Sequence, residues 1–444
     1  MWKTFSKGGI HPQENKLSAR HPVHEADLPR QAVILLSQHI GAPATPIVAR
    51  GDEVKVGTRI ADPAGFVSAP VHASVSGRVA RVDRAIDVSG YPRPAIFIDV
   101  EGDEWEPSID RSETLVRDCP LSPEEILRKI ADAGIVGMGG ACFPSHVKLS
   151  PPPPLKAECL VVNAVECEPY LTADHQLMVE HADEIVVGVS ILMKAIRVEK
   201  AYIGIEANKP DAIRLLTKAA EACAGVEVVP LKVKYPQGGE KQLIDAVLGR
   251  QVAAGALPVS TGAVVQNVAT VFAVYQAVQK HKPLFERIVT VTGQSLARPS
   301  NLLVRIGTPV GQLVEACGGL PEDTGKVIAG GPMMGRSLVS LDVPVSKGTS
   351  GVLLMGGREA RRMAVQPCIR CAKCVAVCPM GLEPYLLATA SAHGDFVRVE
   401  QEGILSCIEC GSCQFTCPSG RPILDYVRLG KSKVGAMVKV RQAK

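Results

Sequence analysis

Apolar and polar residues are spaced differently in successive parts of the chain. Over residues 46–82 they alternate, with Gly-Asp and Ser-Gly pairs at short intervals, which indicates short strands and tight turns. Over residues 159–231 short apolar runs alternate with helical stretches, which indicates βαβ units and a mainly parallel sheet. Residues 286–318 predict two strands and then a helix, and helical stretches follow both cysteine-rich segments near the C-terminus. The pattern predicts a multidomain α/β protein.

The length also indicates several domains, because 444 residues exceed the roughly 250–300 at which a single core stops growing. We expect a β scaffold over 1–115, a Rossmann-like α/β domain over 116–285, a β-grasp (SLBB-like) domain over 286–358, and a helical ferredoxin-like domain with a basic tail over 359–444. The first domain resembles the barrel-sandwich hybrids of biotinyl and lipoyl proteins, which carry their prosthetic group on a hairpin lysine. The corresponding tip, 73–77, reads ASVSG and has no lysine, so we expect a scaffold.

One helix start is specified in detail. Ser122 stands at the N-cap, Pro123 at the first helical position and Glu125 three residues after the cap. This arrangement predicts a capping box, with Gly134 ending the helix just before a glycine-rich loop.

Eight of the fourteen cysteines fall into two runs with the spacing C-x2-C-x2-C-x3-C-P. Three thiolates from one tight turn suit three corners of an iron–sulfur cube, whereas a zinc ribbon takes two C-x2-C pairs from distant loops. In two-cluster ferredoxins the fourth cysteine of each run crosses to the other cluster. We therefore assign one [4Fe–4S] cluster to Cys368, Cys371, Cys374 and Cys417, and the other to Cys407, Cys410, Cys413 and Cys378. A pair of zinc ribbons is the alternative.

Composition and charge indicate the cellular location in which these cysteines act. The net charge of +4 is too small to indicate a nucleic-acid partner, and no apolar run approaches the ~20 residues that cross a bilayer. The N-terminal residues show no secretory signal, so we expect a cytosolic chain, or one on a cytosolic membrane face, whose cysteines bind metal. The basic segment 431–444 is interpreted as a solvated tail, with an anionic-membrane contact as the alternative.

Residues 134–140 contain four glycines, a density that lets the backbone approach a flat or charged ligand closely. They match neither the dinucleotide fingerprint nor the P-loop. On its own, this stretch indicates a flexible loop as readily as a cofactor cradle.

Several motifs together resemble one family. GMGGACFPSHVKL, NAVECEPYLTAD, YPQGGEKQL, QNVAT and the double cysteine run occur in the order seen in the C subunit of the Rnf (Rsx) electron-transport complex. The likeness extends from residue 8 onward, and the middle also resembles the flavin- and NADH-binding subunit of respiratory complex I. The resemblance implies noncovalent FMN, NAD(H), and hydride transfer without a protein acid or base. It also implies membrane-subunit and ferredoxin-like B-subunit partners, coupling to Na⁺ or H⁺, and a peripheral place on the cytoplasmic face of the inner membrane.

The resemblance also assigns roles to residues. Three loop glycines would lie against the flavin, with Lys148 and Asn163 beside it and Asn267 at the ribityl phosphate. Phe143 would stack on the adenine of NADH, and Glu168 and Glu240 would contact the dinucleotide. The full predicted cofactor-binding set is Gly137, Gly139, Gly140, Phe143, Lys148, Asn163, Glu166, Glu168, Tyr235, Gly238, Gly239, Glu240 and Asn267. Taken singly, Phe143 could equally be core, and the charged residues could be solvated.

Three residues depart from the related patterns. Cys142 stands where glycine is usual, which is tolerable at negative φ and awkward at positive φ, and His146 and Val165 replace a glycine and an acid. These departures leave open a wiring or docking subunit whose flavin site has decayed. A soluble NADH-diaphorase subunit of a hydrogenase or formate dehydrogenase is the other alternative.

Overall fold

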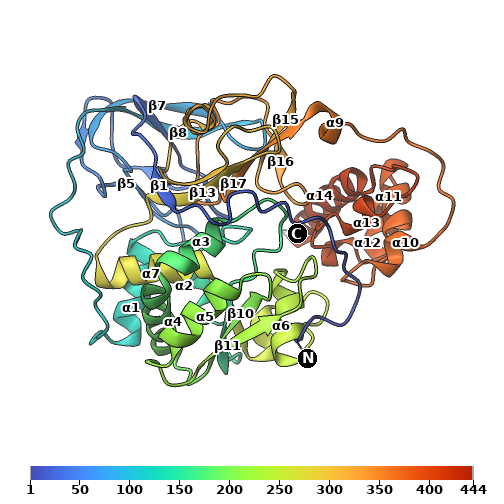
Figure 1. The fold of residues 1–444 in the computed structure, drawn as a ribbon, viewed down its shortest axis with the longest axis horizontal. Coiled ribbons are helices and arrows are strands. Elements are labelled where there is room, and N and C mark those ends of the chain that lie inside the picture. The colour runs from blue at the N-terminus through green and yellow to red at the C-terminus, as the bar shows by residue number, and fades with distance from the viewer. Residues whose placement is uncertain (1, 443–444) are drawn as a thin grey trace.

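The computed structural model describes residues 2–442, and within them the strands form four sheets. Figure 1 shows the β-rich part above the α/β part, with a separate helical module at one side. No helix in the described range is both long and apolar enough to cross a bilayer.

The N-terminal domain is made of two small β-sheets, in agreement with the short strands predicted from its alternating pattern. One sheet has the order β2-β8-β7-β4, and a second has the order β3-β5-β6. Their inward positions, among them Ile34, Ile60 and Ile96, are fully buried between the sheets. The strands are β2 (Gln31–Leu35), β3 (Thr45–Pro46), β4 (Glu53–Val54), β5 (Arg59–Asp62), β6 (Val71–His72), β7 (Gly77–Ile86) and β8 (Pro92–Val100).

The middle domain has the predicted parallel sheet, in the order β11-β10-β9-β12, with helices packed on it. Its strands are β9 (Cys159–Asn163), β10 (Ala201–Glu206), β11 (Val226–Leu231) and β12 (Ala263–Asn267). Its helices are α1 (Pro123–Asp132), α2 (Ser145–Lys148), α3 (Ala173–Glu180), α4 (Ala182–Ile196), α5 (Pro210–Ala220), α6 (Glu240–Leu248) and α7 (Val268–Gln279), with the 3-10 turn η1 (Pro258–Thr261). The predicted capping box is present at Ser122 and Glu125.

The strand order creates one special position in this sheet. From β9 the chain adds β10 and β11 on one side, and then returns to add β12 on the other. In open α/β sheets, ligands bind at the carboxyl ends of the strands where the order reverses. Here those ends are Asn163 and Asn267, which are direct partners in the β9–β12 register.

The third domain is built on a six-stranded sheet in the order β1-β14-β13-β17-β15-β16. The chain N-terminus supplies β1, which pairs in parallel with β14; nothing in the local pattern predicted this pairing. The elements are β1 (Val23–Glu25), β13 (Glu286–Thr292), β14 (Ser300–Arg305), α8 (Val310–Ala316), β15 (Thr324–Ala329), β16 (Arg336–Ser337), β17 (Gly351–Gly356) and α9 (Gly357–Ala360). As predicted, α8 begins after Thr308-Pro309.

The C-terminal module is helical, as expected. It consists of α10 (Lys373–Ala376), α11 (Pro384–Ala392), α12 (Phe396–Gln401), η2 (Ile404–Ser406), α13 (Ser412–Phe415) and α14 (Ile423–Gln442). Leu387, Val399 and Val427 form the centre of its small core. The basic segment belongs to α14 up to residue 442, and residues 443–444 lie outside the described range.

Candidate functional site

The two cysteine runs have the same backbone conformation. Arg370 and Ala372 of the first run (residues 368–378) have φ of 55° and 59°, and the equivalent Glu409 and Gly411 of the second run (residues 407–417) have 57° and 77°. A short helix follows each turn, α10 and α13. Left-handed residues in such turns direct backbone N–H groups toward a common centre, and the Glu409 N–H donates to the Cys407 Sγ at 3.4 Å. The runs are therefore structural repeats.

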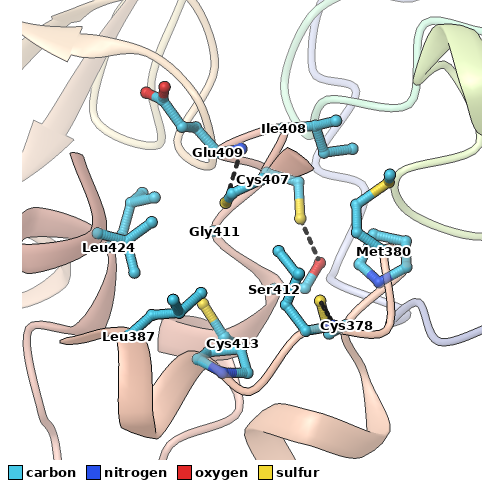
Figure 2. A pocket seen from close by; sticks show the side chains of 15 residues that line it. Cys378, Met380, Leu387, Cys407, Ile408, Glu409, Gly411, Ser412, Cys413 and Leu424 are labelled. Carbon is cyan, nitrogen blue, oxygen red and sulfur yellow. Dashed lines mark hydrogen bonds between the residues drawn. The ribbon is translucent and has the colours of Figure 1, made fainter. Parts of the chain in front are cut away.

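Three thiols of the second run and one of the first surround a single pocket, which we call the second-run pocket. Cys407, Cys410 and Cys413 line it together with Cys378, and apolar side chains such as Leu424 complete the wall (Figure 2). This is the grouping expected when the fourth cysteine crosses between clusters.

Burial controls the ionisation of these thiols. It raises the pKa of Cys407 to about 11, with Cys410 and Cys378 adding to the rise. It also raises the pKa of Cys413 and Cys410, again with neighbouring thiols contributing. Metal binding to this pocket must therefore displace protons.

The thiols of the first run are more accessible. Cys368 and Cys371 are exposed, and Cys374 and Cys417 are partly buried. The Gln366 N–H donates to the Ser419 carbonyl at 2.9 Å, which brings the chain entering the first run beside the chain leaving the second. Among residues 2–442, no three or more His, Cys, Asp or Glu side chains meet as the ligands of a single metal ion, and the four thiols of the second-run pocket instead line a shared space.

The predicted flavin residues gather at the strand-order switch. A Cβ on Gly139 would lie 2.9 Å from the Asn267 Cβ, so only glycine allows this approach, whereas a Cβ on Gly140 would meet nothing within 4 Å. The Asn163 Nδ2 donates to the Gly238 carbonyl at 2.8 Å, which ties the YPQGGE loop to β9. We use the name flavin pocket for the region where these residues and Gly137 meet.

Other predicted residues are placed around this pocket. Lys148, at the end of α2, and Glu240, at the start of α6, form an ion pair of 2.5 Å, so each neutralises the other. Gly239 directly precedes α6, and a Cβ there would clash with the Gln242 side chain. Phe143 is partly buried, and its carbonyl accepts from the Gly137 N–H at 2.9 Å.

Two glutamates of the ECEP loop make specific contacts with protein. Glu166 accepts from the backbone N–H of Asp174 at 2.7 Å and so caps α3. Glu168 accepts from the backbone N–H groups of Met333 and Met334. Burial raises the pKa of Glu168 to about 7 against the opposing effect of these hydrogen bonds. A dinucleotide contact of Glu168 stays a prediction.

Tyr235 connects the two sites. It is buried, its backbone pairs with Ile10, and its hydroxyl donates to the Cys410 carbonyl at 2.8 Å. Three residues later the same loop reaches Gly238 in the flavin pocket. The second-run pocket is therefore joined to the α/β domain. The end of the first run lies there too, because the Pro379 carbonyl accepts from the Gln242 Nε2 of α6 at 3.5 Å.

The departures noted in the sequence have structural consequences. Cys142 has a φ of 52°, which is unfavourable for a residue other than glycine. Its side chain also packs closely on Gly348, because a Cβ added to Gly348 would lie only 2.5 Å from the Cys142 Sγ. His146 Nε2 contacts the Phe66 carbonyl at 3.0 Å. Val165 is fully buried in the sheet core.

Sequence reasoning missed a buried cation beside the flavin pocket. Arg287 is only 4% exposed, and its Nε and Nη1 have no hydrogen-bond partner within the described chain. Burial lowers its pKa, while Asp174 and Cys142 oppose this effect. Asp174 in turn accepts from the Asn267 Nδ2 at 2.7 Å. A lone arginine in the apolar strand ERIVTVT was the available signal.

The buried Arg287 and the loop glycines are features that fit FMN. An unpaired buried cation is costly, and a phosphate would satisfy Arg287, while the glycine backbone leaves room for a flat ring.

Comparison with known domain families agrees with the geometry. Residues 3–103 match the RnfC barrel sandwich hybrid domain, 130–276 the Nuo51 FMN-binding domain, 288–337 the SLBB domain and 367–421 the 4Fe-4S dicluster domain. The protein is thus an FMN- and iron–sulfur-containing electron-transfer protein. More particularly, it belongs to the RnfC family, the C subunits of the ion-translocating Rnf oxidoreductase complexes.

The relatives that support this assignment match over almost the whole chain. The C subunit of the proton-translocating ferredoxin:NAD(+) oxidoreductase complex of Clostridium ljungdahlii is 46% identical over 100% of this chain and 97% of the relative. Its Na(+)-translocating counterpart from Acetobacterium woodii is 45% identical, with 96% of each chain covered. The C subunit of the ion-translocating oxidoreductase complex of Rhodobacter capsulatus is 42% identical over 97% of this chain and 84% of the relative.

Solved structures show the same fold at lower identity. A chain of an NAD+-reducing [NiFe]-hydrogenase in the air-oxidised state has a TM-score of 0.51 and 20% identity, covering 71% of this chain and 64% of that one. This likeness concerns the fold alone. The predicted family, kinds of domain, FMN and [4Fe–4S] clusters are confirmed, whereas the individual ligand residues and the domain boundaries stay predictions.

Proposed function

We propose that this chain is the subunit of an Rnf-type complex that exchanges electrons between NAD(H), FMN and two [4Fe–4S] clusters. Its relatives are named as subunits of ferredoxin:NAD+ oxidoreductase complexes that translocate protons or Na+. On this proposal the chain sits peripherally on the cytoplasmic face of the inner membrane. It exchanges electrons with membrane subunits and a ferredoxin-like B subunit, and the complex couples this transfer to ion movement.

The observation that carries the proposal is the direct link from the flavin pocket to the second-run pocket. Tyr235 lies in the loop that reaches Gly238, and its hydroxyl holds the Cys410 carbonyl. A Gly411 Cβ would lie 2.9 Å from the Met333 carbonyl, so the β-grasp domain also packs closely on this run. A cluster held by Cys407, Cys410, Cys413 and Cys378 would therefore exchange electrons with the flavin pocket, and a cluster held by Cys368, Cys371, Cys374 and Cys417 would face outward.

The residues of the flavin pocket have separable tasks. Bound FMN would supply the conversion between two-electron hydride chemistry and single-electron transfer. Gly139 and Gly140 would let the backbone lie against the ring, and Asn163 fixes the opposite loop through Gly238. Asn267 and Arg287 would hold the ribityl phosphate, and the Lys148–Glu240 pair stands at the rim.

Cofactor content and reduction test the proposal. The purified, reconstituted chain should hold about one FMN and about eight iron atoms, as two [4Fe–4S] clusters require, and NADH should bleach the flavin band under anaerobic conditions. FMN that binds but is not bleached by NADH would refute the dehydrogenase role. A chain that binds no FMN would favour a docking or wiring subunit instead.

The phosphate role of Arg287 has its own test. Arg287→Gln should weaken FMN binding roughly 10- to 100-fold, because a charge-assisted hydrogen bond contributes about 1.5–3 kcal/mol. Riboflavin, which lacks the phosphate, should bind the variant and the wild type equally, and this also shows that the pocket is folded. Arg214→Gln, on the exposed face of α5, is the matched control. Equal losses for FMN and riboflavin would contradict the assignment.

A further inference from the structure

Residues 361–373, which we call the connecting segment, join α9 to α10 and include the start of the first run. Every residue from 361 to 373 is exposed. Met363, Val365 and Ile369 expose 65%, 62% and 66% of their surface. Figure 1 shows the chain passing around the outer side of the helical module between α9 and α10. Large apolar side chains and the proposed cluster ligands Cys368 and Cys371 thus lie in one exposed segment.

In the second run, residues from other parts of the chain cover the surface that corresponds to this exposed segment. Ile408, the equivalent of Ile369, packs against a cluster formed by Ile10, Tyr235 and Cys410, and Met333 packs against the same cluster. Gly411, the equivalent of Ala372, lies against the Met333 carbonyl. Because the two runs share their backbone turn, the face that the other domains cover in the second run is uncovered in the first.

Charge distinguishes the two faces further. Glu409 pairs with Arg428 and Lys431, so the second face is neutralised within the chain. Its equivalent in the first run is Arg370. The connecting segment has no acidic residue, and its cations are Arg361, Arg362, Arg370 and Lys373. Arg362 pairs with Asp425, while the other three have no ion pair among residues 2–442.

We propose that the connecting segment and the turn of the first run form the docking surface for an acidic redox protein subunit. Carboxylates on that partner pair with Arg361, Arg370 and Lys373, and apolar groups cover Met363, Val365 and Ile369. A protein fits better than a lipid surface, because Cys368 and Cys371 lie within the strip and a headgroup cannot accept their cluster's electrons. The inference rests on the proposed electron-transfer function.

Hydroxyl-radical footprinting of the isolated chain and of the purified whole complex tests the surface. In the complex, labelling of Met363 and Ile369 should fall several-fold relative to the isolated chain. Phe66, which is equally exposed on the barrel-sandwich domain, provides the reference for radical dose. Unchanged labelling of Met363 and Ile369 in the complex would overturn the proposal.

Charge reversal tests the chemistry of the partner. Arg370→Glu combined with Lys373→Glu should slow electron transfer from NADH through the complex by about tenfold or more at low salt. The difference from wild type should shrink as the salt concentration rises, because complementary charges act mainly on the rate at which the partners associate. A second variant, Arg361→Glu with Met363→Glu, avoids the neighbours of the cysteines and should act in the same direction. Arg50→Glu, an exposed arginine of the barrel-sandwich domain, should have no effect.

Two measurements separate this inference from the proposed function. In the isolated chain, NADH should bleach the flavin and reduce both clusters equally in the wild type and in the Arg361→Glu, Met363→Glu variant; failure in the wild type would refute the proposed function itself. Normal internal reduction with unaltered transfer in the variant complexes would refute only the docking surface. Binding of the isolated chain to phosphatidylglycerol vesicles that depends on Arg370 would replace the protein partner with a membrane and overturn the proposal.

Discussion

The two cysteine runs have the same spacing and the same left-handed turns, yet their surroundings are opposite. The second-run pocket lies against three other parts of the chain, through Ile10, Tyr235 and Met333. The first run places Cys368 and Cys371 in solvent. Solvent exposure and hydrogen bonds to sulfur help to set cluster potential. On the proposed function, the residues packed on each run give the repeated motif two roles, an inner relay and an outer outlet.

The largest expected effect tests how the ligands are shared. Cys378→Ser should remove the cluster of the second-run pocket, although Cys378 belongs to the first run in sequence, and iron content should fall by about half because one of two clusters is lost. Electron paramagnetic resonance of the reduced protein identifies the surviving signal as that of the first run. Cys223→Ser, outside both runs, should leave the iron content unchanged. Loss of the other cluster instead would show that the ligands do not cross.

The difference in exposure predicts different oxidative lifetimes. When ferricyanide is added to the isolated, reduced chain, the first-run cluster should be lost several-fold faster than the second, because two of its proposed ligands are exposed. Samples taken at successive times and reduced again with dithionite show how much of each resonance signal survives, which measures this directly. Equal decay rates would mean that the two environments are equivalent in solution.

Tyr235 sharpens the comparison, because the first run has no counterpart to it. Tyr235→Phe leaves the buried Cys410 carbonyl without its donor, and should lower the free energy of unfolding by about 1–3 kcal/mol. Urea denaturation measures the change. Tyr385→Phe, which removes an exposed hydroxyl bonded to Glu383 beside the first run, is the control and should change stability by less than about 0.5 kcal/mol. Similar losses in both variants would contradict a special role for Tyr235.

The smallest effect concerns pH. Burial raises the pKa of Glu168 in the folded chain to about 7, above its ordinary value of 4.5. The unfolded chain therefore releases this proton first, and the folded state loses stability as pH rises from about 4.5 to about 7. Because solvent still partly reaches the side chain, we expect a loss of about 1–2 kcal/mol. Glu168→Gln should remove this part of the pH dependence in denaturant titrations, and an unchanged pH profile would contradict the raised pKa.

Local patterns specified much of this fold. The capping residues Ser122 and Glu125 marked a helix correctly, and the cysteine spacing predicted two equivalent turns. The alternation over 159–231 predicted the parallel sheet. These features depend on residues close in sequence, so a short window contains the physical cause.

Long-range contacts were not predictable in this way. The pairing of β1 with β14 joins distant segments, and Arg287 acquires its importance only from the burial of its guanidinium beside the flavin pocket. The positive φ of Cys142 was recognised as a possible problem but could not be decided from sequence. Likewise, the YPQGGE motif placed Tyr235 near the cofactor, while its hydrogen bond to Cys410 depends on how two domains pack.

Rapid-freeze electron paramagnetic resonance after anaerobic mixing of the whole chain with NADH tests the inner-relay arrangement most directly. The second-run signal, assigned through Cys378→Ser, should develop before the first-run signal, and in that variant the first-run cluster should be reduced much more slowly. Rapid reduction of the first-run cluster in the variant, at the wild-type rate, would show that electrons do not pass through the buried pocket.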